Sequence, residues 1–550
     1  MKQKDTVRWL WRVTGKKKGY ILALTLIQGV AGIIGVVYAL LFRAIVDSAV
    51  AKDAAAFRYN VILIIGLVLV QLGISAVIRW LHELAKSEIE NTFKGRLVDK
   101  ILQKDYASVS ATHTAEWLNR LTNDTTVVAG GAVEILPGLV GTVVRLISAL
   151  IMIIALDRWF AYILIPGGVA LVILTYAFRG VLKRLHKNIQ ESDGRLRVFL
   201  QERISSLMVI KAFTAEKQTS EGASEAMENH KAARLRRNRF SNVANIGFGA
   251  AMQGMYLIGV VYCAHGIMTG RVTYGTLTAI MQLIGQVQGP FANISGYLPR
   301  WYAMTASAER LMEIEEYADD GQAADRETMR RYYEREFHAL GLRNASFTYR
   351  PTGDEEMPVV LDGLNLEIHK GETVAFTGHS GCGKSTVLKL LMCMYPLDSG
   401  ERFIDGEQMT AYHRRLFAYV PQGNALMNGS IKDVVCFAQE YDESRFHRAL
   451  VIACADEFVD DVNTELGERG SGLSEGQMQR LSIARAIYAD APILLLDEST
   501  SALDEGTERR LLENLRGMTD KTVVIVTHRK VALSICDRVL EFTENGVKDK

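Results

Sequence analysis

The chain has 550 residues, with 63 Lys or Arg against 62 Asp or Glu, so its formal net charge is +1. This balance gives no support for a nucleic-acid-binding protein, whose surface is typically basic. With 49% hydrophobic residues and 9 prolines the chain is not disordered, and its length allows about three domains.

Long apolar runs in the first half predict six transmembrane helices. Five runs carry no charged residue, and the run Ile135–Leu156 carries only Arg145. A bilayer core of about 30 Å needs about 20 apolar residues as a helix, so every run is long enough to span it. Buried helices of a soluble protein are the alternative, but they rarely stay uncharged over this length. The expected spans are residues 20–42, 59–78, 135–156, 159–178, 240–270 and 272–299.

The distribution of Lys and Arg predicts the orientation of these spans. Residues 1–19 hold seven, residues 79–134 hold seven and residues 179–239 hold fourteen, whereas the alternate connections 43–58, 157–158 and 271 hold three, one and one. Positively charged connections stay in the cytosol. We therefore expect a multi-pass protein of the cell membrane with both termini and the second half cytosolic.

The long cytosolic connections have a helical composition. Residues 79–105 and 180–239 are charged and contain no proline. We expect them to extend the membrane helices into the cytosol; separate soluble hairpins are the alternative. Residues 1–318 then form a transmembrane domain, and the polar stretch 319–335 is expected to be a linker.

Residues 336–550 alternate strand-like and helical runs, which predicts an α/β domain with a largely parallel sheet. The expected strands are residues 345–349, 359–368, 373–377, 493–496 and 522–526, and Val539–Phe542 is expected to be the last strand. The fold class is therefore an all-α polytopic membrane domain, with six transmembrane helices and long intracellular extensions, plus an α/β domain.

A glycine-rich segment between strand and helix predicts a phosphate-binding loop. It consists of Gly378, His379, Ser380, Gly381, Cys382, Gly383, Lys384, Ser385 and Thr386, and it matches GxxxxGK[ST]. The glycines let backbone N–H groups surround phosphates at the start of a helix. Lys384 is expected to reach the β- and γ-phosphates of ATP, and Ser385 to bind Mg²⁺.

An apolar strand that ends in two carboxylates predicts the catalytic partner of this loop. Asp497 and Glu498 follow Ile493–Leu496. Beside the phosphates, Asp497 can hold Mg²⁺ through water and Glu498 can polarise the attacking water. An Asp-Glu pair at the end of a strand is common in proteins and alone is a weak signal. Its distance after the phosphate loop makes it a strong signal here.

Between these motifs lies Leu473-Ser474-Glu475-Gly476-Gln477, on which the sequence resembles the ABC transporters. The resemblance is to exporters in which six membrane helices are fused to one nucleotide-binding domain and ATP hydrolysis drives transport. It implies that Ser474, Gly476 and Gln477 serve an ATP molecule held by the phosphate loop of a second chain.

The resemblance assigns four further site residues by their order in the chain. It implies that Tyr349 stacks on adenine, that Gln422 contacts Mg²⁺ and the attacking water, that Asp504 lies at the dimer contact and that His528 is the switch histidine. An ordinary strand aromatic, two loop residues and a helix N-cap are the alternatives. With one phosphate loop and six spans the chain is expected to be a half-transporter. A homodimer is favoured and a heterodimer is possible.

Two residues depart from the usual pattern. Glu475 replaces a glycine of the signature; we expect it to face solvent, although an altered signature also fits a heterodimer with one degenerate ATP site. Cys382 lies among the phosphate-loop amides, and we hypothesise that its alkylation blocks ATP binding; a small filler residue is the alternative.

The transported substrate is indicated only by polar residues within the spans. Arg145 costs about 3 kcal/mol in a bilayer unless it faces a cavity or partner, so it is expected either to favour an anionic substrate group or to pack on a polar neighbour. Gln282 and Gln286 share a helical face and either line a cavity or join helices. Amphipathic drugs, lipids and peptides are the candidate substrates.

An ATP-gated channel or a regulatory subunit is the alternative function. It is disfavoured because Glu498, Gln422 and His528 are all present.

Overall fold

The computed structural model describes residues 3–350, 357–423, 426–467, 470, 472–543 and 546–550. Some side chains within 161–186, and those of 290–295, lie outside this description. The chain forms two compact units, one of residues Met1–Gly95 and Thr122–Leu311, the other of Arg96–Leu121 and Met312–Lys550.

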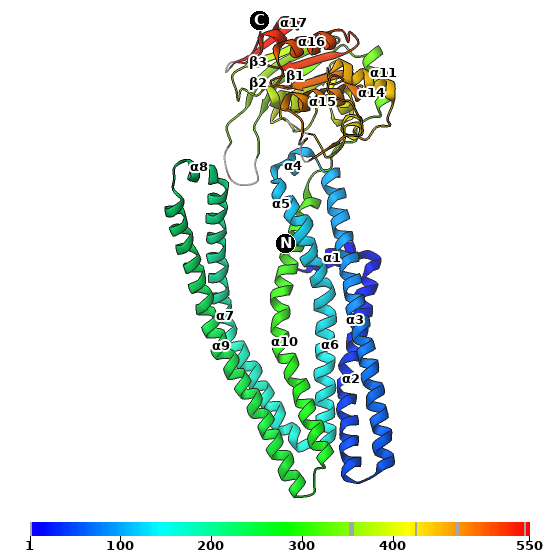
Figure 1. The fold of residues 1–550 in the computed structure, drawn as a ribbon, viewed down its shortest axis with the longest axis vertical. Helices are drawn as coiled ribbons and strands as arrows, with labels where there is room; N and C mark the ends of the chain where they lie inside the picture. The colour runs from blue at the N-terminus through cyan, green and yellow to red at the C-terminus, as the bar shows by residue number, and fades with distance from the viewer. Residues whose placement is uncertain (1–2, 351–356, 424–425, 468–469, 471, 544–545) are drawn as a thin grey trace. The chain divides into compact units, whose positions relative to one another are not determined.

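The first half of the chain is helical. In Figure 1, α7 and α9 run side by side as a hairpin that is closed by the short helix α8. The helices are α1 Gln3–Thr14, α2 Lys18–Val50, α3 Ala54–Gln103, α4 Tyr106–Ala111, α5 Thr114–Asn119, α6 Thr125–Leu156, α7 Arg158–Ser205, α8 Leu207–Ala212, α9 Glu216–Met268 and α10 Tyr274–Glu313.

Four helical stretches of the described residues are long and apolar enough to cross a membrane. They are Asp5–Val50, Ala54–Gln103, Thr114–Leu156 and Glu216–Met268. The expected spans 159–178 and 272–299 lie in the helices α7 and α10, but many side chains of the first and some of the second are outside the described residues, so these two stay predictions.

The predicted helical continuation of the apolar runs into the charged segments is confirmed, whereas the cytosolic position of these segments stays a prediction. Helix α3 continues through its charged second half to Gln103, α7 continues to Ser205, and α9 begins at Glu216 before it reaches its apolar part. No proline interrupts residues 180–239, so the backbone hydrogen bonds of both helices continue into the charged segments.

In the first unit, a close approach at glycine residues and a helix-capping carboxylate bring neighbouring helices into contact. A Cβ on Gly32 of α2 would lie 3.0 Å from the carbonyl oxygen of Gly141 of α6, so only glycine allows this close approach. Asp157 caps α7 by accepting hydrogen bonds from the backbone N–H groups of Trp159 (2.9 Å) and Phe160 (3.2 Å). Its carboxylate also accepts a hydrogen bond from the Tyr262 hydroxyl of α9.

Among its described residues, the second unit contains two larger sheets, a further sheet of two short strands and the helices around them. Its elements are α11 Arg326–Arg335, β1 Ala339–Phe347, β2 Leu361–His369, β3 Thr373–Gly378, α12 Lys384–Leu391, β4 Ser399–Ile404, β5 Glu407–Gln408, β6 Phe417–Val420, β7 Gly429–Ser430, α13 Ile431–Cys436, α14 Glu443–Ile452, β8 Glu465–Leu466, α15 Glu475–Tyr488, β9 Ile493–Asp497, α16 Glu505–Arg516, β10 Thr522–Val526, α17 Lys530–Ile535, β11 Arg538–Thr543 and β12 Gly546–Asp549. One sheet is antiparallel in the order β2-β1-β4-β5. The other has the order β12-β11-β3-β10-β9-β6, in which β12 is antiparallel to β11 and the other neighbours are parallel.

Two sequence expectations need correction in this unit. The stretch 319–335 is not a simple linker, because it ends in α11, whose Met329 and Tyr333 are 3% exposed and belong to the core. Val539–Phe542 lies in β11 but is not the last strand, because the short hairpin to β12 follows it.

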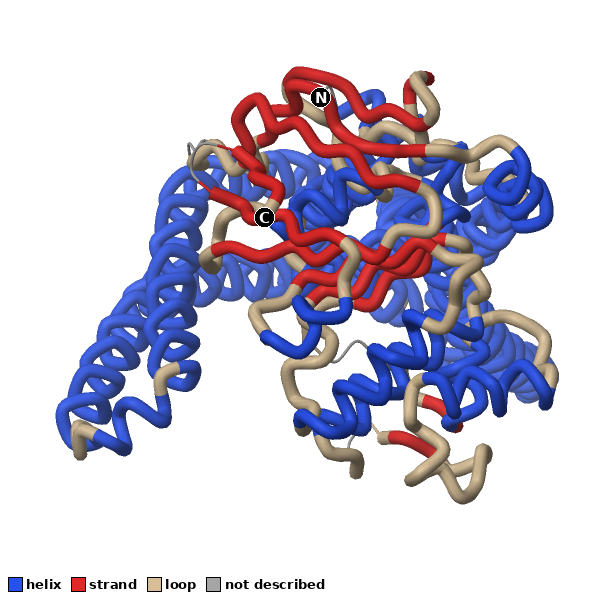
Figure 2. Tube along the Cα trace, turned by 90° about the horizontal axis from the view of Figure 1, so that it is seen from above, coloured by secondary structure: helices blue, strands red, loops and turns tan. Residues whose placement is uncertain are grey.

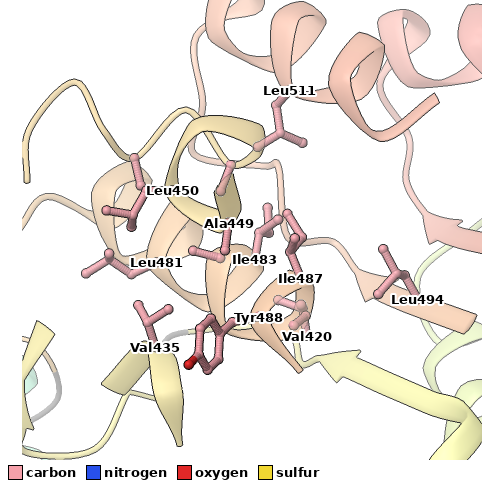
Figure 3. Close-up of a cluster of buried hydrophobic side chains, with 14 of the residues drawn as sticks. Val420, Val435, Ala449, Leu450, Leu481, Ile483, Ile487, Tyr488, Leu494 and Leu511 are labelled. Atoms are coloured by element: carbon pink, nitrogen blue, oxygen red, sulfur yellow. The ribbon is translucent and has the colours of Figure 1, made fainter. Parts of the chain in front are cut away.

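The two sheets form layers with helices on one side (Figure 2). Helix α12 lies between the sheets, because its Val387, Leu388 and Leu391 share a core cluster with residues of β1 and β3. A second cluster packs α13 to α16 on the parallel sheet (Figure 3). At its centre Tyr488 is fully buried, and its hydroxyl donates to the carbonyl of Glu440 at 2.5 Å, so the ring is buried without an unpaired polar atom.

A buried carboxylate joins α6 to α10 within the first unit. Asp124, which precedes α6, is 0% exposed. It accepts two hydrogen bonds from the guanidinium of Arg310 (2.8 and 2.5 Å) and one from the Ser307 hydroxyl (2.9 Å). A buried charge is tolerated only with such compensation.

The Arg310→Met variant should therefore lose stability. It leaves the Asp124 carboxylate buried without its cation, which costs about 3 kcal/mol or more. We expect a clearly lower melting temperature of the detergent-solubilised protein. The control is Arg300→Met, whose partner Glu134 is partly exposed (2.6 Å, 35% exposed), and which should change the melting temperature little. Equal effects of the two substitutions would contradict the prediction.

Candidate nucleotide-binding site

Parallel strand register brings four predicted site segments to one edge of the sheet. Val526 of β10 lies opposite Asp497 of β9 and Phe376 of β3, and Val420 of β6 lies opposite Leu496 of β9. Each strand ends at this edge, so the loops that follow β3, β6, β9 and β10 carry their residues to the same place. The carboxyl edge of a parallel sheet is where α/β folds bind ligands.

The phosphate loop has the backbone that its glycines allow. Gly378, Gly381 and Gly383 have φ values of 137°, 87° and 92°, a region that side-chain-bearing residues rarely adopt. Gly383 lies directly before the first residue of α12, so the loop leads into the N-terminus of that helix. His379, Ser380 and Gly381 are exposed at the tip of the loop.

Lys384 is folded back over this loop. Its ammonium donates to the carbonyls of Gly378 (2.8 Å) and His379 (2.9 Å), and it lies 3.5 Å from the thiol of Cys382. The residue is only 5% exposed. Both carbonyls are neutral acceptors, so the positive charge remains available to an anion such as a phosphate.

Asp497 is joined to the loop through Ser385. The Ser385 hydroxyl donates to Oδ1 of Asp497 at 2.8 Å, and the Tyr419 hydroxyl donates to Oδ2 at 3.1 Å. Asp497 is 1% exposed, and burial raises its pKa, which the two hydrogen bonds counteract. Burial and the adjacent Asp497 raise the pKa of Tyr419 as well, so this hydroxyl stays a donor.

Glu498 faces Gln422 across the site. The side-chain amide of Gln422 donates to Oε2 of Glu498 at 2.7 Å. Glu498 has φ of 48°, unusual for a residue with a side chain, and its N–H donates to the carbonyl of Val526 at 3.1 Å. This left-handed turn takes the carboxylate out of the strand, and strain of this kind gathers at functional sites. His528, two residues after β10, is exposed.

Tyr349 is held beside the phosphate loop by an aromatic cluster. Its ring meets Phe347 and Tyr395 edge to face, with centroids 4.8 and 5.3 Å apart. Its hydroxyl lies 3.0 Å from that of Thr386. The ring is partly exposed, so a planar ligand can reach it from solvent.

The signature residues cap a helix of their own. Ser474 is the N-cap of α15 and forms a capping box with Gln477. Glu475 is exposed in the single chain, as expected, and Gly476 lies close to Ala502, where an added Cβ would be 3.0 Å from the carbonyl oxygen. Among the described residues, no hydrogen bond or ion pair joins this segment to the phosphate loop.

Asp504 starts the next helix. Its carboxylate accepts a hydrogen bond from the N–H of Thr507 at 3.0 Å and so caps α16, and this bond lowers its pKa. The capping alternative is therefore correct for the single chain, and it leaves the predicted dimer contact untested.

The structure adds three residues that the sequence did not single out. Tyr419 touches Asp497, while Arg529 and the buried Glu508 form an ion pair beside the loop that follows β9. A tyrosine two residues before Pro421 and an arginine next to His528 are visible in the sequence. Only the fold, however, shows what they contact.

The predicted substrate residues lie in the first unit. Arg145 is exposed on α6 of the single chain. Gln286 of α10 donates to the carbonyl of Gly35 in α2 at 2.5 Å, so it joins two helices. The Oε1 atoms of Gln282 and Gln286 are buried and have no hydrogen-bond partner among the described residues.

Two family models match the chain. The one described as ABC transporter transmembrane region matches residues 21–291, and the one described as ABC transporter matches residues 361–501. The two are fused in the order that the fold shows, a helical part followed by an α/β part.

Curated relatives align with much of this chain. The leukotoxin translocation ATP-binding protein LktB of a Pasteurella haemolytica-like species is 29% identical over 367 residues, 64% of this chain and 50% of that protein. The ATP-dependent lipid A-core flippase of Aliivibrio fischeri is 28% identical over 460 residues, 80% of this chain and 75% of that protein. Antigen peptide transporter 2 of Rattus norvegicus is 27% identical over 474 residues, 83% and 65% of the two chains. The aligned part is thus only about half the length of LktB.

A solved structure shares the fold. A bacterial Atm1-family ABC exporter with ATP bound superimposes with a TM-score of 0.77 and 20% identity, covering 98% of this chain and 95% of that one. Together with the two family models and the relatives, the phosphate loop, the acidic strand end and the signature helix place this chain in the family of ABC transporters.

Proposed function

We propose that the chain is one half of a dimeric exporter in which ATP hydrolysis drives transport across the cell membrane. The observation that carries this proposal is the set of contacts at the sheet edge. Lys384, Ser385 and Asp497 form one group, and Glu498 with Gln422 forms the other. These groups follow helices long enough to cross a membrane in the same chain.

The contacts support a separate role for each of these residues in ATP hydrolysis. The loop amides and the Lys384 ammonium bind the β- and γ-phosphates. Glu498 accepts a proton from a water that Gln422 helps to orient, and the oxygen of this water forms the new bond to the γ-phosphorus. The bond from phosphorus to the β-phosphate oxygen breaks, ADP leaves, and His528 contacts the γ-phosphate from the other side.

The donor set suits Mg²⁺. Ser385 offers a hydroxyl, Asp497 a carboxylate and Gln422 an amide oxygen, which are the hard oxygen donors that this ion prefers. Ser385 and Asp497 are already 2.8 Å apart. When bound, the ion would neutralise charge on the phosphates.

A second chain supplies what one chain lacks. Ser474, Gly476 and Gln477 start a helix whose N-terminal amides suit an anion, but among the described residues no hydrogen bond or ion pair links them to their own phosphate loop. The α7–α8–α9 hairpin exposes apolar side chains at its tip, with Met208 86% and Phe213 78% exposed. Such exposure favours a protein partner, and a second copy satisfies both features.

The orientation of the protein follows from its charges. Lys and Arg gather in the segments 1–19, 79–134 and 179–239, so both termini and the ATP-binding unit are cytosolic.

ATP binding draws the two nucleotide-binding units together, and the long helices α3, α7 and α9 transmit this closure to the membrane. The transported molecule belongs to the amphipathic drugs, lipids or peptides, and Arg145 favours an anionic group on it.

The Glu498→Gln variant should bind ATP without turning it over. The amide keeps the shape of the side chain but cannot accept the proton from water. We expect the Kd for ATP to stay within about twofold and kcat to fall by about 10² or more, since a general base contributes 10²–10⁴. Binding of a fluorescent ATP analogue and steady-state phosphate release measure the two effects, and rapid continuous hydrolysis by the variant would refute the role.

Alkylation of Cys382 should block ATP binding. Its thiol lies 3.5 Å from the Lys384 ammonium, so a bulky adduct would occupy the place of the phosphates. We expect N-ethylmaleimide to abolish binding of the fluorescent analogue, ATP to protect against it, and Cys382→Ser to resist it. The Cys393→Ser variant is the control and should remain sensitive. If adducts mapped to Cys382 by mass spectrometry leave binding intact, the hypothesis is wrong.

Replacement of Arg145 should impair transport of anionic substrates. Arg145→Ala removes the cation, whereas Arg145→Lys keeps it. We expect stimulation of ATPase activity by anionic amphipathic compounds to fall several-fold in the first variant and to persist in the second, in a panel that also contains neutral and cationic compounds. Equal loss for all three charge classes would instead indicate a packing role.

A further inference from the structure

Arg529 links the histidine loop to the loop that follows the acidic strand. Its guanidinium donates to the carbonyls of Thr500 (2.8 Å) and Leu503 (2.6 Å). Its Nε lies 3.0 Å from Oε2 of Glu508. The two carbonyls belong to the segment after β9 and Glu508 to α16, whereas Arg529 directly precedes α17, which packs against α16 (Figure 1).

Glu508 makes this link difficult to break. It is 0% exposed, and Oε1 accepts a hydrogen bond from the Thr500 hydroxyl at 2.8 Å. A fully buried carboxylate needs a compensating cation, and Arg529 provides it. The ion pair is therefore not one of the exposed pairs that contribute little.

The contacts also fix His528 from both sides. The N–H of Thr527 donates to the carbonyl of Phe376 at 3.1 Å, and the N–H of Arg529 donates to the Thr527 hydroxyl at 3.1 Å. His528 lies between these two anchored residues. The backbone that carries it is thus tied to β3 on one side and, through Arg529, to residues 500–503 on the other.

We propose that Arg529 is a positioning residue, which makes His528 and the 500–504 loop move as one body during hydrolysis. This inference rests on the proposed function of the site. Residues 500–504 lead from Glu498 to Asp504, the residue expected at the dimer contact. A shift of that loop on dimer closure would be transmitted to His528 through the guanidinium.

The planar guanidinium suits this role better than any other side chain. One NH2 group donates to two carbonyl oxygens, while Nε lies 3.0 Å from the Glu508 carboxylate as an ion pair, so one rigid guanidinium contacts three partners. The ammonium of a lysine can neutralise Glu508, but it cannot keep this planar arrangement. Charge and geometry can therefore be separated by mutation.

The test compares turnover, ATP binding and stability in the full-length protein in lipid. We expect Arg529→Met to lower kcat at least tenfold with the Kd for ATP within twofold, and to lower the melting temperature because Glu508 stays buried and charged. Arg529→Lys should restore most of the melting temperature but less than half of kcat. The double variant Arg529→Met/Glu508→Gln should regain stability, since the buried charge is gone, and should not regain kcat.

Arg509→Met is the matched control. Arg509 lies on the same helix as Glu508 and pairs with Glu505 in solvent at 3.6 Å, so its removal should change neither quantity. If kcat recovers together with the melting temperature in the double variant or in Arg529→Lys, Arg529 is only structural and the proposal is overturned. A wild-type protein that does not hydrolyse ATP, or a fully active Glu498→Gln variant, would instead refute the proposed function itself.

Discussion

The site depends on the parallel pairing of four short strands, β6, β9, β10 and β3. Parallel strands present all their carboxyl ends at one edge, so residues that are far apart in the chain meet there. Ser385 and Asp497 reach hydrogen-bonding distance in this way, as do Gln422 and Glu498. The strands themselves are held by burial, since every residue of β9 and β10 is buried. A slip of one strand by a residue would remove Asp497 or His528 from the site.

The same edge explains why some site residues were predictable and others were not. The phosphate loop and the Asp497–Glu498 pair are continuous in sequence and carry their own local context, a strand before and a helix after. Tyr419 could not be identified, because its role depends on a neighbouring strand in register. Arg529 could not be identified either, since its two carbonyl acceptors and its ion-pair partner Glu508 lie 21 to 29 positions earlier in the chain. Contacts that are set by tertiary packing leave no local pattern.

Outside the site, too, the sequence predicts local structure but not the contacts that depend on tertiary packing. The continuation of α3, α7 and α9 was predictable, because helix-forming residues without proline follow each apolar run. The polar stretch 319–335 was misjudged, because composition cannot reveal that Met329 and Tyr333 point from α11 into the core. Gln286 illustrates a third case. Its helical face was evident, yet whether its amide lines a cavity or joins helices is decided by Gly35, whose missing side chain leaves room for the Gln286 amide to reach the backbone of α2.

The ATP-binding unit therefore has two parts: the hydrolytic residues contact one another within the chain, and the signature residues, in the part of the chain that the structure describes, lack such contacts with them. Its phosphate loop, acidic pair and Gln422 are joined by hydrogen bonds, whereas among the described residues no hydrogen bond or ion pair links Ser474 or Gly476 to the phosphate loop of the same chain. Asp504, at the start of the next helix, uses its carboxylate to cap α16 and remains on the surface. Arg529 connects these two parts, because it binds the backbone just before Asp504 and carries His528 next to it. A partner that presses on residues 500–504 would then act on the hydrolytic part through one guanidinium, rather than through the many weak contacts of the surrounding core.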